Sequence, residues 1–419
     1  YNFKSKEKYE YIAEALGVES FDLSESDLDY SSISEKELLV LAYDGDMEAA
    51  YYLGRSYDYG TNGAAQNFSS AMEWYRTADA YGNAKASTAL GYMYLNGCGT
   101  DVDYDTAKEY FYRSISLNNP EGYAGLGRVN IALDNKSGAF DEFTKADGGG
   151  SIDGTYYLGY CYEKGIGCTK NFGKAVMLYE KAINSKSSEY EDLINSLSSS
   201  SQENDEDEDK DTEDDEDIID TEDVYPYCAA LTGLAGCYLD GRGVTENEGL
   251  AIRLYEMAAA YDYSMALYYL GIIYEEGYGV SKDYNKALGY FELAAQKDYA
   301  PALNEIGCMY FNGRGVDVNY SQAVYYQKLS AALGYEKAQI NLGYLYENGY
   351  GVDDDLDAAL YYYQMAADES YPGALEATER ILDKIRQRDE LAKKQEEALD
   401  NISDETTEDE ITENDTDNK

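Results

Sequence analysis

The chain of 419 residues contains no histidine, and it has only 33 lysines and arginines against 82 aspartates and glutamates. Without histidine, the commonest general base and the commonest metal ligand are both missing. The net charge of −49 argues against nucleic acid and anionic membranes as partners, because both are bound through basic patches. We therefore expect a non-catalytic protein with no cofactor and no bound metal.

Long apolar runs and cysteine pairs are also missing. No run approaches the roughly 20 apolar residues that cross a membrane, so we expect no membrane insertion. None of the six cysteines forms a Cys-x-x-Cys pair, which favours free thiols in the cytoplasm, with Cys161 and Cys168 as the one local pair that could close. The chain opens without Met or an apolar signal core, so we expect a longer natural chain, and a secreted or lumenal location stays open.

What the chain does have is a fixed internal period. Small residues recur in steps of 36 in the second half of the chain, at Ala230, Ala266, Ala302, Ala338 and Ala374. A second column keeps the same step, at Ala251, Ala287, Ala323 and Ala359. In the first half the steps from Ala49 are 37, 36 and 32 residues. Two columns with one period identify a repeat protein.

Each repeat predicts two helices. In the first helix, the opening small residue, a Leu four positions later and a Tyr eight positions later share one face, and a Gly or Ala beside the Leu allows close approach of a neighbouring helix. In the second helix, an alanine, an aromatic pair and another small residue form the facing stripe. A Gly-x-Gly loop ends the first helix through positive φ, and a following Asp, Asn or Ser can cap the second.

The combination Leu-Gly-x-x-Tyr-x-x-Gly-x-Gly-Val, Lys-Ala, aromatic pair and Ala-Ala, as in residues 266–295, resembles the Sel-one-like repeat family, a relative of tetratricopeptide repeats. The resemblance implies an all-α, right-handed superhelical solenoid of antiparallel helix pairs, with first helices on the concave face, acting as an adaptor or scaffold. Because some family members serve protein degradation at the endoplasmic reticulum, the resemblance leaves a lumenal or secreted adaptor with disulfides as the alternative. Cysteine-rich relatives are linked to β-lactam binding or hydrolysis, but this chain lacks their regular cysteine pairing.

The repeats divide the chain into six expected segments. They are an N-terminal helix, link and capping helix (1–48), four repeats (49–184), a disordered acidic insertion (185–225), four repeats (226–371), a capping helix (372–399) and a disordered acidic tail (400–419). The third repeat is degenerate because it lacks the Gly-x-Gly loop. Residues 203–223 of the insertion and the tail are too acidic to form a core, and together they carry −22, which leaves −27 on the rest of the chain.

Two local patterns resemble ligand loops without completing them. The run from Asp101 begins like a calcium loop, but Thr106 and Tyr112 stand where Gly and Glu are needed. The run GCTKNFGK at 167–174 has the wrong spacing for a phosphate loop, and no Ser or Thr follows its last Lys. A capped helix start and an ordinary repeat loop account for these two runs.

Positions that differ between repeats are where a partner would be recognised. The residues two and six positions after each opening small residue lie one turn apart, away from the packing stripe, and Tyr and Arg are frequent there. They predict a concave groove for a peptide or protein with a basic surface. The predicted groove residues are Tyr51, Arg55, Tyr92, Arg128, Tyr156, Tyr160, Tyr268, Ile272, Asn304, Ile340 and Tyr344. The alternative is that these side chains only pack between neighbouring repeats.

Overall fold

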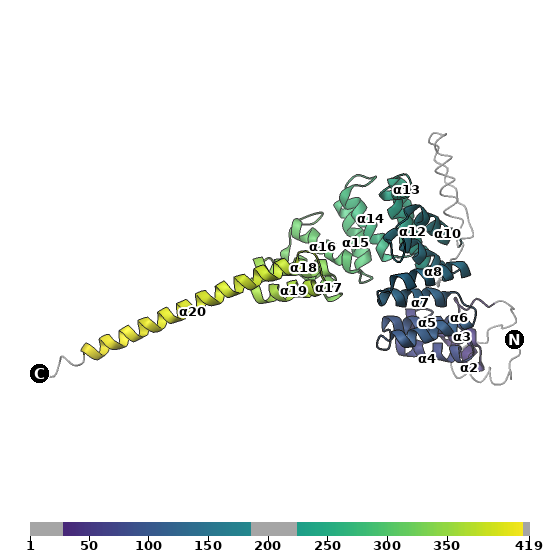
Figure 1. The fold of residues 1–419 in the computed structure, drawn as a ribbon, viewed down its shortest axis with the longest axis horizontal. Coiled ribbons are helices and arrows are strands. Elements are labelled where there is room, and N and C mark those ends of the chain that lie inside the picture. Colours follow the sequence, from purple (N-terminus) through teal and green to yellow (C-terminus); the bar gives the residue numbers. More distant parts are fainter. Residues whose placement is uncertain (1–27, 186–223, 414–419) are drawn as a thin grey trace. The chain divides into compact units, whose positions relative to one another are not determined.

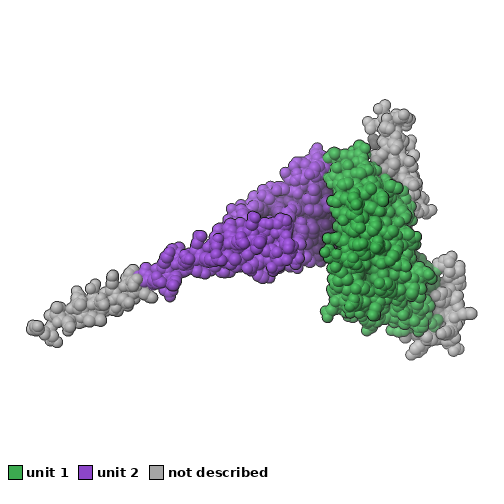
Figure 2. All heavy atoms as spheres, in the orientation of Figure 1, with its two compact units in different colours: residues 1–261 green, residues 262–419 purple. Residues whose placement is uncertain are grey.

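The computed structural model describes residues 28–185 and 224–413, and every regular element in these ranges is an α-helix (Figure 1). The all-α prediction is confirmed. The chain divides into two compact units, Tyr1–Tyr261 and Asp262–Lys419 (Figure 2). The expected N-terminal helix and nearly all of the expected acidic insertion fall outside the described residues.

Unit 1 is a stack of helix pairs behind one leading helix, in which each helix packs on the next. Its described helices are α2 (Glu35–Asp44), α3 (Met47–Tyr59), α4 (Phe68–Ala80), α5 (Ala84–Asn96), α6 (Tyr104–Ser116), α7 (Glu121–Ala132), α8 (Lys136–Gly149), α9 (Ile152–Lys164), α10 (Phe172–Asn184), α12 (Val224–Leu239) and α13 (Glu248–Ala259). The first helices also touch directly, α5 on α7, α7 on α9 and α9 on α12.

The insertion does not interrupt this stack. The helix that follows it, α12, packs on both α9 and α10, the helices of the repeat before it. The boundary between compact units therefore lies after residue 261, one repeat later than the insertion that separates the two predicted repeat blocks. The reason is that the insertion joins the end of one helix to the start of its neighbour, so its length does not alter the packing of the helices on either side.

Unit 2 continues the same pattern and ends in a long helix. Its described helices are α14 (Ser264–Glu276), α15 (Tyr284–Ala295), α16 (Ala300–Asn312), α17 (Tyr320–Ala332), α18 (Glu336–Asn348), α19 (Leu356–Asp368) and α20 (Ala374–Glu413). Only the start of α20 packs on α19, through Ala377, Ile381 and Ile385, and every residue from 386 to 399 is exposed.

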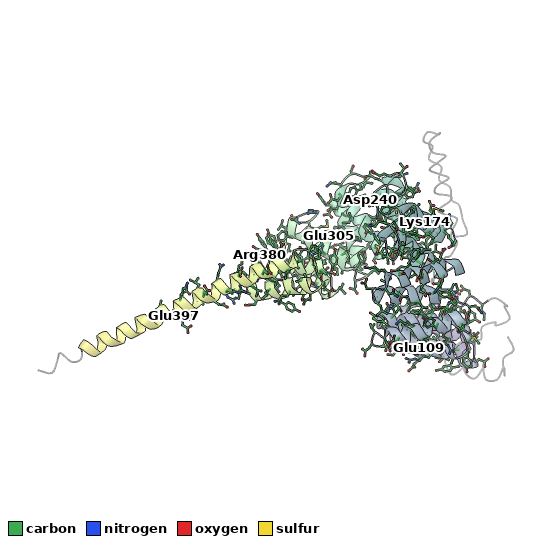
Figure 3. The ribbon with its side chains drawn as sticks, viewed as in Figure 1. Glu109, Lys174, Asp240, Glu305, Arg380 and Glu397 are labelled. Carbon is green, nitrogen blue, oxygen red and sulfur yellow. The ribbon has the colours of Figure 1, made fainter. Side chains whose placement is uncertain are left out.

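The tail differs from expectation. Helix α20 runs to Glu413, beyond the predicted end at residue 399, into the stretch where a disordered tail was expected. No glycine or proline interrupts residues 374–413, so the backbone has no local reason to leave the helix. Figure 3 labels Arg380 near the packed start of α20 and Glu397 farther along it.

Polar caps start the second helices, as the sequence predicts. In every described repeat an Asp or Asn accepts a hydrogen bond from the first-turn backbone, namely Asn67, Asp103, Asn135, Asn171, Asn247, Asp283, Asn319 and Asp355. The Gly-x-Gly loops have the expected positive φ, for example 80° at Gly277 and 66° at Gly279. These local signals define the helix boundaries.

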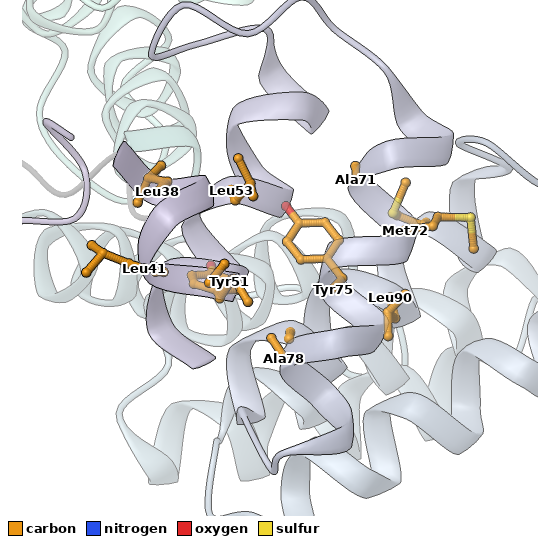
Figure 4. Close-up of a cluster of buried hydrophobic side chains, with 14 residues drawn as sticks. Leu38, Leu41, Tyr51, Leu53, Ala71, Met72, Tyr75, Ala78 and Leu90 are labelled. Atoms are coloured by element: carbon orange, nitrogen blue, oxygen red, sulfur yellow. The ribbon is translucent and has the colours of Figure 1, made fainter. Parts of the chain in front are cut away.

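Close packing requires the glycine that follows the recurring Leu of the first helix. In the first repeat, Tyr75 of α4 lies among buried side chains of α3 and α5, beside Leu53 and Tyr51 (Figure 4). A Cβ atom at Gly54 would stand 2.6 Å from Cδ1 of Tyr75. The aromatic ring of the second helix therefore rests directly on the backbone of the first, which confirms the close approach predicted from the Leu-Gly column.

Candidate functional site

Unit 1 contains a cavity of about 500 Å³, which we call the unit 1 cavity. First helices α3, α5, α7, α9 and α12 all contribute to its lining, together with α4 and the loop after α5. Tyr225 and Pro226, at the start of α12, belong to it because α12 packs on α9. A single site is thus assembled from five successive repeats.

Cations lie against aromatic rings in this cavity. The guanidinium carbon of Arg128 lies 4.7 Å from the centroid of the Tyr92 ring, and the Tyr92 hydroxyl donates to Oδ2 of Asp153 at 3.0 Å. The guanidinium carbon of Arg55 lies 5.7 Å from the Tyr59 centroid, and Nζ of Lys85 is 5.8 Å from that of Tyr51. Cation–π contacts of this kind hold the rings in fixed orientations.

Both signs of charge face the cavity. Its charged lining residues are Arg55, Lys85, Arg128, Asp58, Glu121 and Asp153. Burial and the charge of Asp153 raise the pKa of Tyr92 well above its usual value, so its hydroxyl stays a neutral donor. Burial also raises the pKa of Asp58, although the hydroxyl of Tyr75 and the charge of Arg55 act to lower it. The cavity is therefore a mixed polar and aromatic site rather than a uniformly acidic one.

Four of the predicted groove residues meet in this cavity. Tyr51, Arg55, Tyr92 and Arg128 all line it, although they come from three different repeats. The remaining predicted residues of unit 1, Tyr156 and Tyr160, are not among its lining residues. The Tyr156 ring instead packs on the rings of Tyr157 and Tyr179, with centroids 4.9 and 5.9 Å apart.

Some predicted groove residues of unit 2 pack against neighbouring side chains, and others are exposed to solvent. Tyr268 packs on Phe291 and Tyr299, Ile340 packs against the core beneath α20, and Ile272 is half-buried. Tyr344 is 44% exposed.

The assignment of Asn304 to a groove surface is wrong. Its side chain is fully buried, donates to Glu305 at 3.1 Å and accepts from Asn341 of the next repeat at 2.8 Å. At this position the packing alternative holds. The physical reason is that a buried amide must be hydrogen-bonded, and the next repeat supplies its partner.

Several lining residues were not predicted, among them Asp58, Lys85, Glu121, Asp153 and Tyr225. Some of them had a signal in the sequence. Asp58 stands nine positions after Ala49, and acids stand at the same place in three other repeats, at Glu163, Glu275 and Glu347. Lys85, Glu121 and Asp153 also share a column, because each stands directly before the opening small residue of its repeat. Tyr225 follows neither column, so only the packing of the helices reveals it.

The cysteines and acids form no metal site within the described residues. No group of three or more His, Cys, Asp or Glu side chains in residues 28–185 and 224–413 is placed to hold a metal ion. All six cysteines are free, and Cys168 donates through Sγ to the Cys161 carbonyl at 3.4 Å. Burial raises the pKa of Cys161 to about 12, which makes it a poor nucleophile. In the part of the chain that the structure describes, no helix has the length and apolarity to span a bilayer.

A family model described as Sel1 repeat matches seven stretches of the chain, residues 48–78, 84–119, 152–187, 228–260, 264–299, 300–335 and 336–371. The chain belongs to the Sel1 repeat family. These matches confirm the resemblance predicted from the sequence. They pass over residues 120–151, where α7 and α8 nevertheless pack as a helix pair.

Curated relatives are similar over short segments. A component of the Arabidopsis thaliana ERAD-associated E3 ubiquitin-protein ligase, HRD3B, is 29% identical over 97 residues, which are 22% of this chain and 15% of that protein. Chitin synthase regulatory factor 1 of Schizosaccharomyces pombe is 26% identical over 133 residues, which are 31% of this chain and 22% of that protein. The chain thus matches less than a quarter of the length of either relative.

Two solved structures of Sel1-like proteins are similar to this chain. A Sel1 repeat protein from Oxalobacter formigenes is 20% identical with a TM-score of 0.46, over 88% of this chain and 99% of that one. The c5321 protective antigen of uropathogenic Escherichia coli, described as having an SLR fold, is 22% identical with a TM-score of 0.37, over 90% and 79% of the two chains.

Proposed function

We propose that this Sel1 repeat chain is a non-catalytic scaffold that binds an extended segment of another protein in the unit 1 cavity. The observation that carries the proposal is the contact of Tyr92, Asp153 and Arg128, which come from α5, α9 and α7 and face one cavity. A site spread over several first helices suits an extended ligand better than a compact one. Tyrosine and arginine are also the residues that most often dominate protein interfaces.

The proposed partner presents a basic surface. The chain outside residues 203–223 and 400–419 carries −27 of the total of −49, so a basic protein would be attracted from a distance. Such steering raises the association rate and weakens with added salt. The name of one relative places it in a ligase and that of the other in regulation of an enzyme, which fits a scaffold role for this chain without identifying its partner.

Site-specific photo-crosslinking tests the proposal. A benzophenone amino acid at Asn96, an exposed residue that lines the cavity, should crosslink the partner in extract of the native cell. The same probe at Tyr112, which is 61% exposed on the second helix α6, is the control. Adding Tyr92→Ala should remove the crosslink from Asn96. Equal crosslinking from both positions, or a crosslink that survives Tyr92→Ala, would place binding elsewhere.

We propose a cytoplasmic location, in keeping with six free cysteines. When the protein is isolated from its own cell, denatured and alkylated without reductant, all six thiols should be modified. Incomplete alkylation that becomes complete after reduction would instead indicate the lumenal or secreted adaptor. An adaptor in either compartment can use the same cavity, so this measurement separates the two locations without bearing on the binding site.

A further inference from the structure

Carboxylates at the ends of first helices are paired with cations from the following repeat. Glu163, the acid nine positions after Gly154, accepts from the hydroxyl of Tyr179 at 2.7 Å and from Nη1 of Arg242 at 2.8 Å. Arg242 is the middle residue of the next repeat's Gly-x-Gly loop. Its guanidinium carbon lies 5.7 Å from the ring centroid of Phe172. Acid, hydroxyl and ring together form an arginine slot, which Arg242 fills.

Unit 2 repeats this pairing. Glu275 pairs with Arg314, again the middle residue of the following Gly-x-Gly loop. Glu347 accepts from the Tyr363 hydroxyl at 2.9 Å and from Arg380 and Lys384 of α20, both at 2.7 Å. All three acids therefore receive a cation that comes from the element after their own repeat.

The first repeat has the same slot without the arginine. Asp58 accepts from the hydroxyl of Tyr75 at 3.2 Å, and Phe68 begins α4 as Phe172 begins α10. The middle residue of the following loop is Cys98, and the flanking glycines have φ of 73°, in the same region as those around Arg242. Cysteine is too short to reach as arginine does, and it brings no positive charge.

Both loops also lie close to the phenylalanine that begins a second helix. A Cβ atom at Gly99 would stand 2.8 Å from Phe68, and one at Gly243 would stand 2.6 Å from Phe172. Both loops thus approach the start of a second helix closely, and the residue between their glycines is Cys98 in one and Arg242 in the other.

This incomplete slot opens into the unit 1 cavity. Asp58, Phe68, Tyr75 and Cys98 all line it. Within the described residues, the Tyr75 hydroxyl is the only side-chain donor to the Asp58 carboxylate. Arg55, one turn earlier on α3, lowers the pKa of Asp58, but burial outweighs it and the pKa remains raised. A half-buried carboxylate with one hydroxyl donor gains from a charged donor that arrives from outside.

We propose that an arginine side chain of the bound partner enters this slot and pairs with Asp58, in the place that Arg242 takes beside Glu163. The inference rests on the proposed function and names the group that anchors the partner. The walls suit a guanidinium, since the rings of Tyr51, Tyr59 and Tyr92 line the same cavity. Phe68 supplies the ring beneath it, as Phe172 does for Arg242.

A matched peptide array tests the anchor. Each 12-residue peptide is present in one form with a central arginine and in a second form with citrulline, its neutral isostere. The purified full chain should bind arginine forms about tenfold or more tightly than their citrulline forms, as expected for a charge-assisted hydrogen bond. Asp58→Asn should remove this preference. Asp105→Asn, at a fully exposed acid on α6, is the control and should keep it.

A second variant keeps the test interpretable if Asp58→Asn fails to fold. Cys98→Arg should fill the slot from within the chain, raise the unfolding midpoint and also remove the preference for arginine. A preference that persists in both variants would overturn the anchor. Equal binding of arginine and citrulline forms by the natural chain would overturn the anchor and leave the scaffold proposal standing. If the folded chain retained no peptide and the Asn96 probe gave no crosslink, both proposals would fail.

Discussion

Two glycines of unit 2 are expected to respond to alanine in opposite directions. A Cβ atom at Gly271 in α14 would stand 2.4, 2.6 and 2.9 Å from ring atoms of Phe291, whose side chain is fully buried. Such overpacking costs about 1–3 kcal/mol, and the helix propensity of alanine offsets about 0.5–1 kcal/mol of it. We therefore expect Gly271→Ala to destabilise unit 2 by about 1–2 kcal/mol.

Gly289 is the matched control in the facing helix α15. Nothing lies within 4 Å of a Cβ atom built there. Alanine should therefore add helix propensity without strain and stabilise the chain by about 0.5–1 kcal/mol. Because both changes add one methyl group to a helix of the same repeat, their difference isolates the contact with the Phe291 ring.

Urea unfolding followed by circular dichroism measures both variants, with hydrogen exchange of α14 and α15 as the local readout. The local readout is needed because repeat arrays can unfold in parts. With a urea slope of about 1–3 kcal/mol/M, Gly271→Ala should lower the midpoint by roughly 0.5–1 M and speed exchange in both helices. Gly289→Ala should do the reverse. A Gly271→Ala chain as stable as the natural one would refute the close-approach argument.

Two further predictions concern the ion pairs. Arg242→Ala removes one donor from Glu163, whose side chain is 6% exposed, and should lower the free energy of unfolding by about 1.5–3 kcal/mol. The control, Lys282→Ala, breaks a half-exposed pair and should change it by less than about 0.5 kcal/mol, so similar urea midpoints for the two variants would contradict the prediction. Burial would raise the pKa of Glu347, but hydrogen bonds from its cationic partners hold it at about 2, below the ordinary 4.5. The stabilisation that ionised Glu347 contributes is therefore complete above pH 4.5 and is lost as pH falls towards 2. Between pH 4.5 and 2.5, Glu347→Gln should lose less stability than the natural chain. Equal losses in the two chains would contradict the low pKa of Glu347.

Most of the fold could be predicted because its signals are local and periodic. The 36-residue step, the Leu-Gly column and the Asn or Asp caps each specify a helix or its end without reference to distant residues. The end of α20 was misplaced since acidity was taken as disorder, whereas a run without glycine or proline can stay helical.

The candidate site could be predicted only in part. Helical spacing selected the face that holds Tyr51, Arg55, Tyr92 and Arg128, and these four residues line one cavity. It could not distinguish them from Asn304, because spacing describes one helix and burial depends on the neighbour that covers it. Whether a position is a surface or an interface is decided between repeats.

The sequence by itself determined the repeat unit, the order of its helices and the positions where glycine must stand. Only the tertiary structure placed Tyr225 of α12 in the same cavity as Asp153 of α9, because this needs the stack to continue across the insertion. It also placed Cys98 beside Asp58, where other repeats have an arginine against an acid. These pairings join residues of different repeats, and packing rather than local propensity brings them together.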